Sequence, residues 1–348
     1  MARRILWASL ALAPATILVD LLTDAGKVAL FVLAAAALIP LAWLIGEATE
    51  HAAEHTGPGI GGFLNASFGN APELIIALLA IADNLPVVVR GSLAGSVISN
   101  LLLVFGVTQL VGPEKAIDRR SLLVQLGLVA VAVLLLIIPV WLGYTGNPER
   151  HGAVLASIPI AVVLLGLYLT VTGRNLRRHR DAERDDGHEP SAGAWSLPTS
   201  LVALALATVA TAVVSEILVH SLEAFAEAIG ATDFFIAAVI VAIVGNAAEH
   251  GGAIVIARAG KMKLASEIAV SSSAQVGLLV APAVMLLSLL FTHQLPLSFR
   301  WEELVAMAGA VALAAATIWD GSTKRWEGAA LVVAYVGVGA AFWFAGNR

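Results

Sequence analysis

Two glutamates stand inside long apolar stretches, each within the same short phrase. Residues 69–75 read GNAPELI and residues 245–251 read GNAAEHG, so Glu73 and Glu249 each follow a glycine by four positions. A carboxylate inside a membrane-spanning segment costs several kcal/mol, so an acid in this position usually has a function. Two such carboxylates facing each other would suit a hard divalent cation such as Ca²⁺, which prefers oxygen ligands.

The same two acids could also carry protons, because buried carboxyl groups that repel one another keep their protons more readily than exposed ones. A site that holds either a cation or protons, but not both, couples the two fluxes in opposite directions. We therefore predict antiport, with Glu73 and Glu249 in both roles. His250 is predicted to assist proton transfer because imidazole titrates near neutral pH, and a buried structural histidine is the alternative.

Other polar residues near the two phrases could complete the site. Asn70 and Asn246 offer amide oxygens three positions before each glutamate, and the apolar span that follows each phrase carries a polar stripe. From the stripes we predict Ser99 and Gln275 as further cation ligands. The alternatives are interhelical hydrogen bonds for the asparagines and close helix packing for the serines. The stripes contain Ser96, Ser99, Asn100, Ser271, Ser272, Ser273 and Gln275.

The two phrases belong to an internal repeat. A shift of 176 positions maps Gly69, Asn70 and Glu73 onto the second phrase, and it maps residues 96–99 onto residues 272–275. Pro72 adds a helix break just before Glu73. Broken helices in matching positions of two halves are typical of the substrate site of a transporter.

Acidic clusters stand near the ends of two further apolar runs. Such clusters concentrate cations at the entrance of a transport path, although solvated helix ends carry acids for no further purpose. We name them the first mouth cluster and the second mouth cluster. The first consists of Glu47, Glu50 and Glu54, and the second of Glu216, Glu223 and Glu227. A shift of 173 positions relates two residues of each cluster.

Residues 51–55 also fit the pattern H-x-x-E-H, which occurs in a class of zinc proteases. On a helix this pattern would place His51, Glu54 and His55 on one face, where they could bind zinc. An intramembrane metalloenzyme is therefore a competing hypothesis, but the sequence offers no third ligand outside the pattern.

The composition indicates an all-α, polytopic membrane protein. Hydrophobic residues make up 59% of the 348 residues and charged residues 13%, with a mean hydropathy of +0.88, whereas a soluble domain is about one quarter charged. Cysteine is absent, which excludes a disulfide framework. About eleven apolar runs are long enough to span a bilayer. They are residues 5–22, 28–46, 62–81, 88–111, 121–143, 152–172, 198–219, 232–257, 265–290, 302–319 and 327–345.

The distribution of Lys and Arg predicts an inside N-terminus and an outside C-terminus. This orientation places 15 basic residues in inner segments and 5 in outer ones. The two phrases then run in opposite directions, as in two inverted five-helix repeats. The predicted parts are an extra N-terminal helix, the first repeat, a solvated cytoplasmic linker and the second repeat, at residues 1–24, 28–172, 173–197 and 198–345.

The phrases GNAPELI, GSLAGSVISNLLLVFG and GNAAEH resemble the cation/proton exchangers of the calcium/cation antiporter superfamily. The resemblance covers about residues 40–290. It implies Ca²⁺ export driven by inward protons, with Glu73 and Glu249 as the shared acids. Sodium/calcium exchangers of that superfamily carry Thr-Ser-Pro-Glu phrases and extra acids on the following helix, where this chain has Ser99, Asn100 and Gln275. The difference favours proton coupling over sodium coupling.

We expect no permanently bound cofactor, with Ca²⁺ and H⁺ as transported substrates and the lipid bilayer as the main partner. Nothing in the sequence points to nucleic acid, and a homo-oligomer is compatible with the sequence but not readable from it. The compact chain suggests a prokaryotic cytoplasmic membrane. The main alternative function is a sodium-coupled or passive cation transporter or channel.

Overall fold

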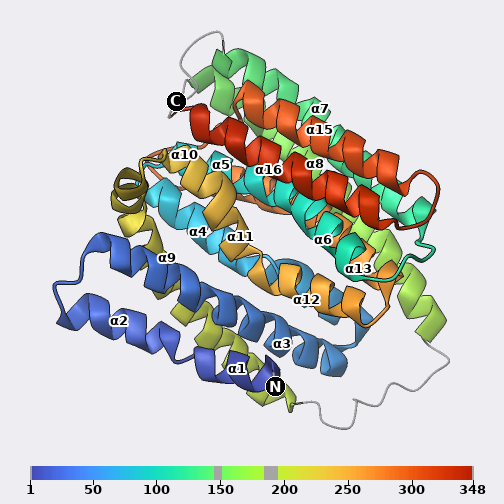
Figure 1. The fold of residues 1–348 in the computed structure, drawn as a ribbon, viewed down its shortest axis with the longest axis horizontal. Coiled ribbons are helices and arrows are strands. Elements are labelled where there is room, and N and C mark those ends of the chain that lie inside the picture. The colour runs from blue at the N-terminus through green and yellow to red at the C-terminus, as the bar shows by residue number, and fades with distance from the viewer. Residues whose placement is uncertain (1, 145–150, 184–194, 347–348) are drawn as a thin grey trace.

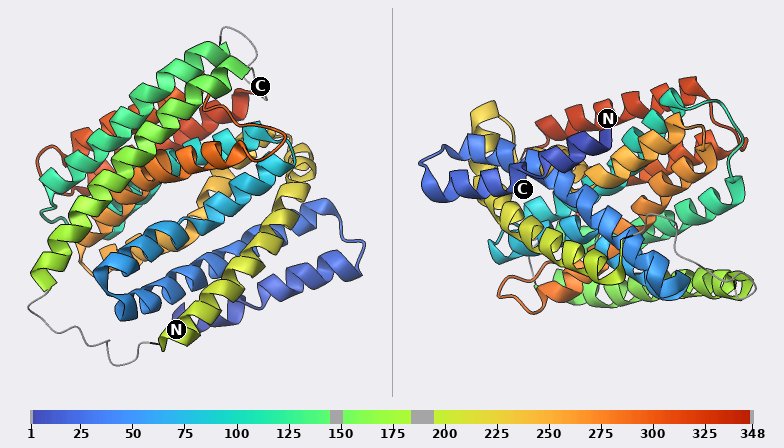
Figure 2. Two further views of the ribbon diagram at one scale, coloured as in Figure 1. Left: turned by 180° about the vertical axis from the view of Figure 1, so that it is seen from behind. Right: turned by 90° about the horizontal axis from the view of Figure 1, so that it is seen from below.

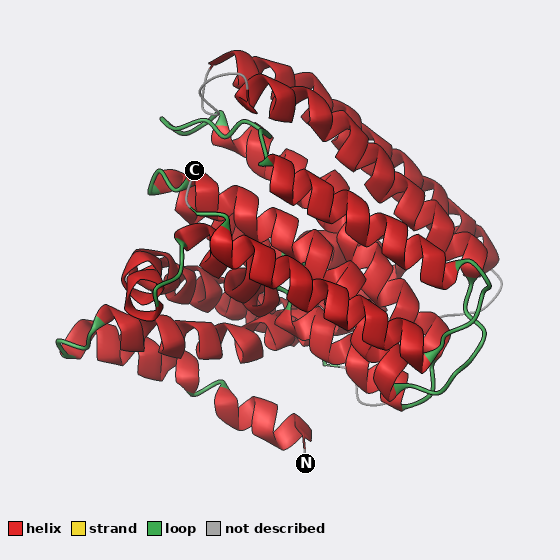
Figure 3. Cartoon of the chain, turned by 45° about the horizontal axis from the view of Figure 1, so that its top comes forward, coloured by secondary structure: helices red, strands yellow, loops and turns green. Residues whose placement is uncertain are grey.

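The computed structural model describes residues 2–144, 151–183 and 195–346. This part of the chain folds into helices joined by short loops and contains no β-strand, only an isolated bridge between Ala116 and Ser322 (Figure 3). Helices satisfy their own backbone hydrogen bonds, which lipid cannot do. The prediction of an all-α, polytopic membrane protein is confirmed.

The helices follow one another along the chain with three π-helical segments, η1 to η3, inserted among them (Figure 1). Their bounds are α1 (Ala2–Ser9), α2 (Leu12–Leu22), α3 (Lys27–Phe68), α4 (Ala71–Ala82), α5 (Pro86–Ile98), η1 (Ser99–Val104), α6 (Phe105–Val111), α7 (Arg119–Tyr144), α8 (His151–Glu183), α9 (Leu197–Ile229), α10 (Asp233–Phe235), η2 (Ile236–Val241), α11 (Ala242–Gly245), α12 (Ala247–Arg258), α13 (Met262–Gln275), η3 (Val276–Val280), α14 (Ala281–Ser288), α15 (Trp301–Ile318) and α16 (Arg325–Phe344).

Within the described residues, nine helices are long and apolar enough to cross a membrane. A tenth span arises if the segment from α10 to α11 and the helix α12, bent by 58° at their junction, are one span. The predicted span 62–81 is divided between the end of α3 and the 12-residue helix α4. The total of eleven spans therefore remains a prediction.

The N-terminal span and the linker differ in detail from their predicted bounds. The predicted first span, 5–22, is split into α1 and α2, which lie at one edge of the bundle (Figures 1 and 2). Pro14 lies in the first turn of α2, where its missing N–H group leaves no hydrogen bond unmade. The predicted linker 173–197 begins inside α8, which continues to Glu183, and residues 184–194 lie outside the described part of the chain.

Related helices in the two halves have matching bounds. Both ends of α4 and α12 differ by 176 positions, and the π-helical segments η1 and η3 interrupt the next span at related places. The packing is also paired, because α4 packs on α9 as α12 packs on α3, and α6 packs on α16 as α14 packs on α8. These pairs support a duplicated chain, while the division into inverted five-helix repeats remains a prediction.

Two glycines allow helices from the two halves to touch through their backbones. A Cβ atom added at Gly95 in α5 would lie 2.0 Å from the carbonyl oxygen of Ala238 in η2. Likewise, a Cβ atom on Gly328 in α16 would lie 2.6 Å from the carbonyl oxygen of Gly106 in α6. The first contact sets α5 directly against the segment that leads into α11 and α12, and this arrangement positions the polar residues described next.

Candidate cation and proton site

Glu73 and Glu249 occupy equivalent places, in the first turns of α4 and α12. The partial positive charge of a helix N-terminus stabilises a carboxylate there. The Glu73 side chain is 8% exposed and that of Glu249 is half-buried. The two turns lie side by side, because Gly245, four residues before Glu249, is in contact with the Glu73 side chain. The structure therefore brings together the two acids that the repeat predicted.

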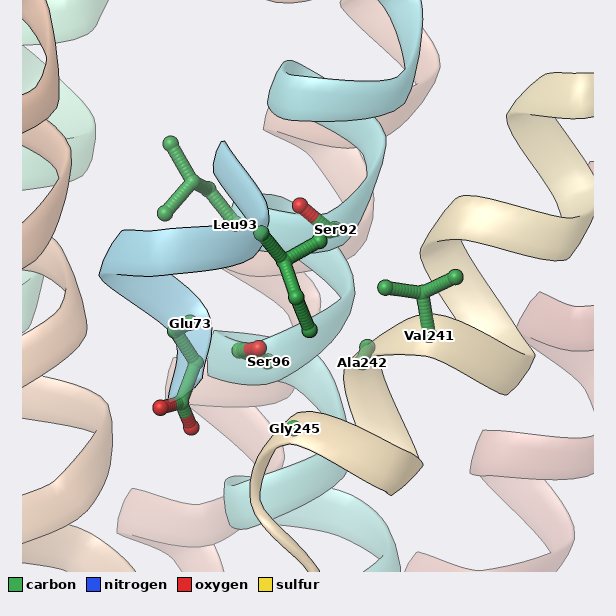
Figure 4. Close-up of a pocket in the computed structure, with 8 residues that line it drawn as sticks. Glu73, Ser92, Leu93, Ser96, Val241, Ala242 and Gly245 are labelled. Carbon is green, nitrogen blue, oxygen red and sulfur yellow. The ribbon is translucent and has the colours of Figure 1, made fainter. Parts of the chain in front are cut away.

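The helix breaks beside these acids occur at Asn70 and Asn246. Their backbone angles leave the helical range, with φ and ψ of −102° and 16° at Asn70 and −90° and 10° at Asn246. In Figure 4 the side chain of Glu73 points toward the turn at Gly245. A Cβ atom on Gly245 would lie 3.3 Å from the Cγ of Glu73, so the absence of a side chain there leaves room for the glutamate.

Each glutamate has one oxygen that the surrounding protein does not satisfy. The Oε2 atoms of Glu73 and Glu249 are buried and have no hydrogen-bond partner among the described residues. Buried polar atoms normally have a partner, and an unpaired buried charge costs much more than an unpaired neutral group. Either a bound cation or a bound proton would remove this cost. The alternate binding of a cation and protons by this pair remains a prediction.

A hydrogen-bond network joins Asn246 and His250 to α5 and η1. The Asn246 Nδ2 atom donates to Ser96 Oγ at 2.8 Å and to the Ala242 carbonyl oxygen at 2.9 Å. Asn100 Nδ2 donates to Asn246 Oδ1 at 3.4 Å, and Asn100 Oδ1 lies 3.1 Å from His250 Nε2. Because an amide oxygen only accepts, His250 Nε2 is the donor in this contact. The network fixes Asn246 and His250 beside Glu249.

The other half has a simpler arrangement. Asn70 Nδ2 donates to Gln275 Oε1 at 2.7 Å, so these two predicted ligands lie together between α4 and α13. Ser99 instead donates to the Ser96 carbonyl oxygen of its own helix at 3.2 Å. A small pocket beside Glu73 is lined by Ser92 and Ser96 rather than by Ser99 (Figure 4).

Sequence reasoning did not select Ser96, Asn100 or Ser92 over Ser99. The first two residues are four positions apart and therefore share one face of a helix. The four-residue spacing of Ser96 and Asn100 could therefore have identified them, whereas only the polarity of Ser92 within an apolar span distinguishes that residue in the sequence. Asn246 contributes its amide to the network, so in this conformation it positions its neighbours. Its role as a direct ligand, and that of Ser99, remain predictions.

The two mouth clusters lie on α3 and α9. In the first cluster Glu47 lies 3.8 Å from His51, measured from Oε1 to Nε2. The three glutamates of the second cluster are exposed, and on the same face of α9 the Nε2 atom of His220 lies 3.2 Å from Oδ2 of Asp83, the residue that follows α4. The first cluster was predicted at the end of a span but lies in the middle of α3, because this helix continues to Phe68, whereas the second cluster lies in the C-terminal half of α9. The function of both clusters remains a prediction.

The structure does not favour the zinc hypothesis. The ring of His51 packs on Trp195 with 4.7 Å between ring centroids, and His55 Nε2 hydrogen-bonds the Trp195 carbonyl oxygen at 2.6 Å. Across the described residues, no group of three or more His, Cys, Asp and Glu side chains converges to hold a metal ion. The two histidines instead hold the start of the segment that leads into α9.

Comparison with known proteins agrees with this geometry. The profile of the sodium/calcium exchanger protein family matches residues 26–176 and 199–344. The chain therefore belongs to this family, and the resemblance found from its repeated phrases is confirmed.

Individual relatives match over nearly the whole chain. The Ca(2+)/H(+) antiporter ChaA of Bacillus subtilis (strain 168) is 40% identical over 321 residues, covering 88% of this chain and 90% of the relative. The Ca(2+)/H(+) antiporter of Aphanothece halophytica is 34% identical over 338 residues, covering 91% of each protein. The solved structure of native YfkE superposes with a TM-score of 0.83 at 34% identity, covering 97% of this chain and 99% of that one.

Proposed function

We propose that this protein is a secondary active antiporter that exchanges Ca²⁺ for protons across a membrane. The observation that carries the proposal is the pair of buried glutamate oxygens without partners at two helix breaks. The antiporter names of the relatives from Bacillus subtilis and Aphanothece halophytica support the same substrates. The protein acts as a transporter and not as an enzyme, with Ca²⁺ and H⁺ as its cargo.

In this mechanism Glu73 and Glu249 bind Ca²⁺ and protons alternately. When both are ionised, their mutual repulsion is relieved by a divalent cation, and when the cation leaves, protons neutralise them. Asn70 and Gln275 hold each other across the two halves and offer amide oxygens at the edge of the site. Binding of either cargo removes the buried charge, and this permits the site to face the two sides of the membrane in turn.

His250 assists the exchange of protons with Glu249. Its Nε2 atom is engaged by Asn100, which leaves Nδ1 as the nitrogen able to accept a proton. The mouth clusters concentrate cations at the two entrances. With the N-terminus inside, as the Lys and Arg distribution predicts, the protein exports Ca²⁺ from the cytoplasm and admits protons.

Sodium coupling is a second candidate, because the family profile includes sodium/calcium exchangers. The resemblance to the superfamily implies that sodium coupling goes with extra acids on the spans that follow the two glutamates. The spans that follow the two glutamates carry Ser99, Asn100 and Gln275 at the relevant positions, and all three are uncharged. Proton coupling therefore accounts better for the site.

Transport into proteoliposomes tests the proposal. Purified protein is reconstituted, a pH gradient is imposed, and Ca²⁺ uptake is measured together with proton movement and with a matched sodium gradient. Glu73→Gln and Glu249→Gln keep the side-chain shape but remove the charge, so each should abolish coupled uptake, and the two losses should not add. Glu303→Gln is the control, because Glu303 is also fully buried but caps the start of α15, where its carboxylate accepts from the Arg300 backbone N–H.

The control separates a lost site from a lost fold. All three variants should elute as folded protein on size-exclusion chromatography, and only the two site variants should fail to transport. Uptake at a near-normal rate by either site variant would make that glutamate structural. Uptake driven by sodium and not by protons would favour the second candidate.

A further inference from the structure

One end of the helix bundle carries a concentration of basic residues that the transport site does not use. Three loop regions meet there, namely residues 112–120, 258–263 and 319–326, which we call the basic platform. They contain eight Lys and Arg residues against three Asp and Glu residues. In Figure 1 the connected ends of α6, α7, α15 and α16 lie on this side of the molecule.

Hydrogen bonds tie the three loops into one unit. Lys115 Nζ donates to the Gly260 carbonyl oxygen at 3.1 Å, which joins the first loop to the second. The backbone N–H of Ile117 donates to the Gly321 carbonyl oxygen at 2.9 Å, and that of Thr323 donates to the Lys115 carbonyl oxygen at 3.0 Å. These bonds join the first loop to the third, so the basic side chains extend from a fixed frame.

The acids of the basic platform are engaged within it. Asp118 accepts from the backbone N–H of Ser121 and Glu114 from that of Arg325. Asp320 pairs with Lys324 and also accepts from Ser322. The Lys324 hydrogen bond lowers the pKa of Asp320 to about 2, so this carboxylate stays ionised and bound to its neighbour. All three acids are thus engaged by groups of the platform or the residue next to it, whereas Arg119, Arg120, Lys261 and Lys263 are exposed.

The arginines stand beside exposed tryptophans at the ends of membrane spans. The guanidinium of Arg119 lies 4.5 Å from the centroid of the Trp319 ring, a cation–π contact. Trp319 and Trp326 are 64% and 67% exposed, and Arg120 is also exposed. Tryptophan favours the depth of the lipid headgroups, so the neighbouring arginines are held at the depth of the phosphates.

We propose that the basic platform binds the headgroups of anionic phospholipids, with Arg119 and Arg120 as the principal phosphate contacts. Clusters of four to eight basic residues next to a membrane span are a recognised pattern for such lipids. Arginine is suited to this role because its planar guanidinium forms paired hydrogen bonds to phosphate oxygens. Here the stacking of Arg119 on Trp319 fixes the guanidinium, and the hydrogen-bonded loops fix the tryptophan.

Native mass spectrometry of the full-length protein in neutral detergent tests the proposal. The protein is titrated with phosphatidylglycerol or with phosphatidylcholine of the same acyl chains. We expect tighter binding of phosphatidylglycerol, weakened by salt. The double variant Arg119→Gln/Arg120→Gln should lose about 30-fold in affinity for this lipid. The control Arg174→Gln removes an exposed arginine at the end of the α8 span, outside the basic platform, and should bind like the wild type.

Several results would overturn the proposal. One is equal retention of both lipids by the wild type, and another is equal binding of phosphatidylglycerol by the double variant and the Arg174 control. A third is displacement of the lipid by millimolar inorganic phosphate, which would make this a site for free anions. Tight binding of a polyglutamate peptide that excludes the lipid would assign the surface to a protein partner. Thermal melting of each variant in detergent shows that a loss of binding is not a loss of fold.

Discussion

The contact between Gly95 and Ala238 should control both the stability of the protein and the geometry of its site. In a Gly95→Ala variant the new methyl carbon would lie 2.0 Å from the Ala238 carbonyl oxygen and 2.6 Å from its carbonyl carbon. A relaxed carbon–oxygen contact needs about 3.3 Å, so α5 and η2 must separate by about 1.3 Å. Overpacking of this kind costs about 1–3 kcal/mol, and a clash with backbone belongs at the upper end.

The same displacement reaches the site, because Ser96 follows Gly95 directly. The hydrogen bond from Asn246 Nδ2 to Ser96 Oγ, now 2.8 Å, would stretch to about 4 Å if the helices separate by the amount the clash requires. We therefore expect a lower Tm in detergent and a slower Ca²⁺ uptake in proteoliposomes.

Gly127→Ala provides the matched control. Gly127 lies in α7, and a Cβ atom there would have no neighbour within 4 Å. Alanine is a better helix former than glycine by up to about 1 kcal/mol, so this variant should be as stable as the wild type or more stable. If Gly95→Ala melts and transports like Gly127→Ala, the close contact between α5 and η2 does not support the site.

Three further predictions concern the periphery. Replacing all three glutamates of the first mouth cluster with glutamine should raise the apparent Michaelis constant for Ca²⁺ at low ionic strength, and an unchanged constant would remove the entrance role. A single cysteine at Lys261 should react with an impermeant thiol reagent only from the cytoplasmic side in cells, and reaction from outside would reverse the orientation. The hydrogen bond from Lys324 lowers the pKa of Asp320 to about 2. The ionised Asp320 therefore stabilises the folded protein above pH ~4, and this stabilisation is lost as the pH falls through about 2. In the Asp320→Asn variant, Tm should therefore depend less on pH than in the wild type, and only in that acid range. A large loss of Tm at pH 7 would contradict the exposed position of this pair.

Sequence periodicity could predict the features that depend on local chemistry. The helix breaks at Asn70 and Asn246 follow from glycine and asparagine in equivalent phrases, and the repeat required Glu73 and Glu249 to occupy equivalent places. Apolar length located most of the spans because a bilayer demands it. The continuation of α3 to Phe68 was not predictable, because residues 57–62 read GPGIGG, and glycine and proline normally end a helix.

Contacts between the halves could not be predicted in the same way. Ser96, and not Ser99, lines the pocket beside Glu73 because of the rotation of α5 about its axis, which the backbone contact at Gly95 sets. The π-helical segment that begins at Ser99 also changes the angle between successive residues, so a face assigned from 3.6 residues per turn is displaced. The hydrogen bonds of Asn100 to Asn246 and His250 arise only once two distant segments cross at this point.

Proton release during Ca²⁺ binding tests the central claim most directly. Calorimetric titration of the purified protein with Ca²⁺ in two buffers of different ionisation enthalpy, at several pH values, counts the protons released for each cation bound. We predict net proton release in the wild type and an apparent affinity that weakens as the pH falls, because protons occupy the same two carboxylates. Glu73→Gln and Glu249→Gln should each lose tight Ca²⁺ binding together with the associated proton release. Tight Ca²⁺ binding without proton release at any pH would contradict a site shared by cation and protons.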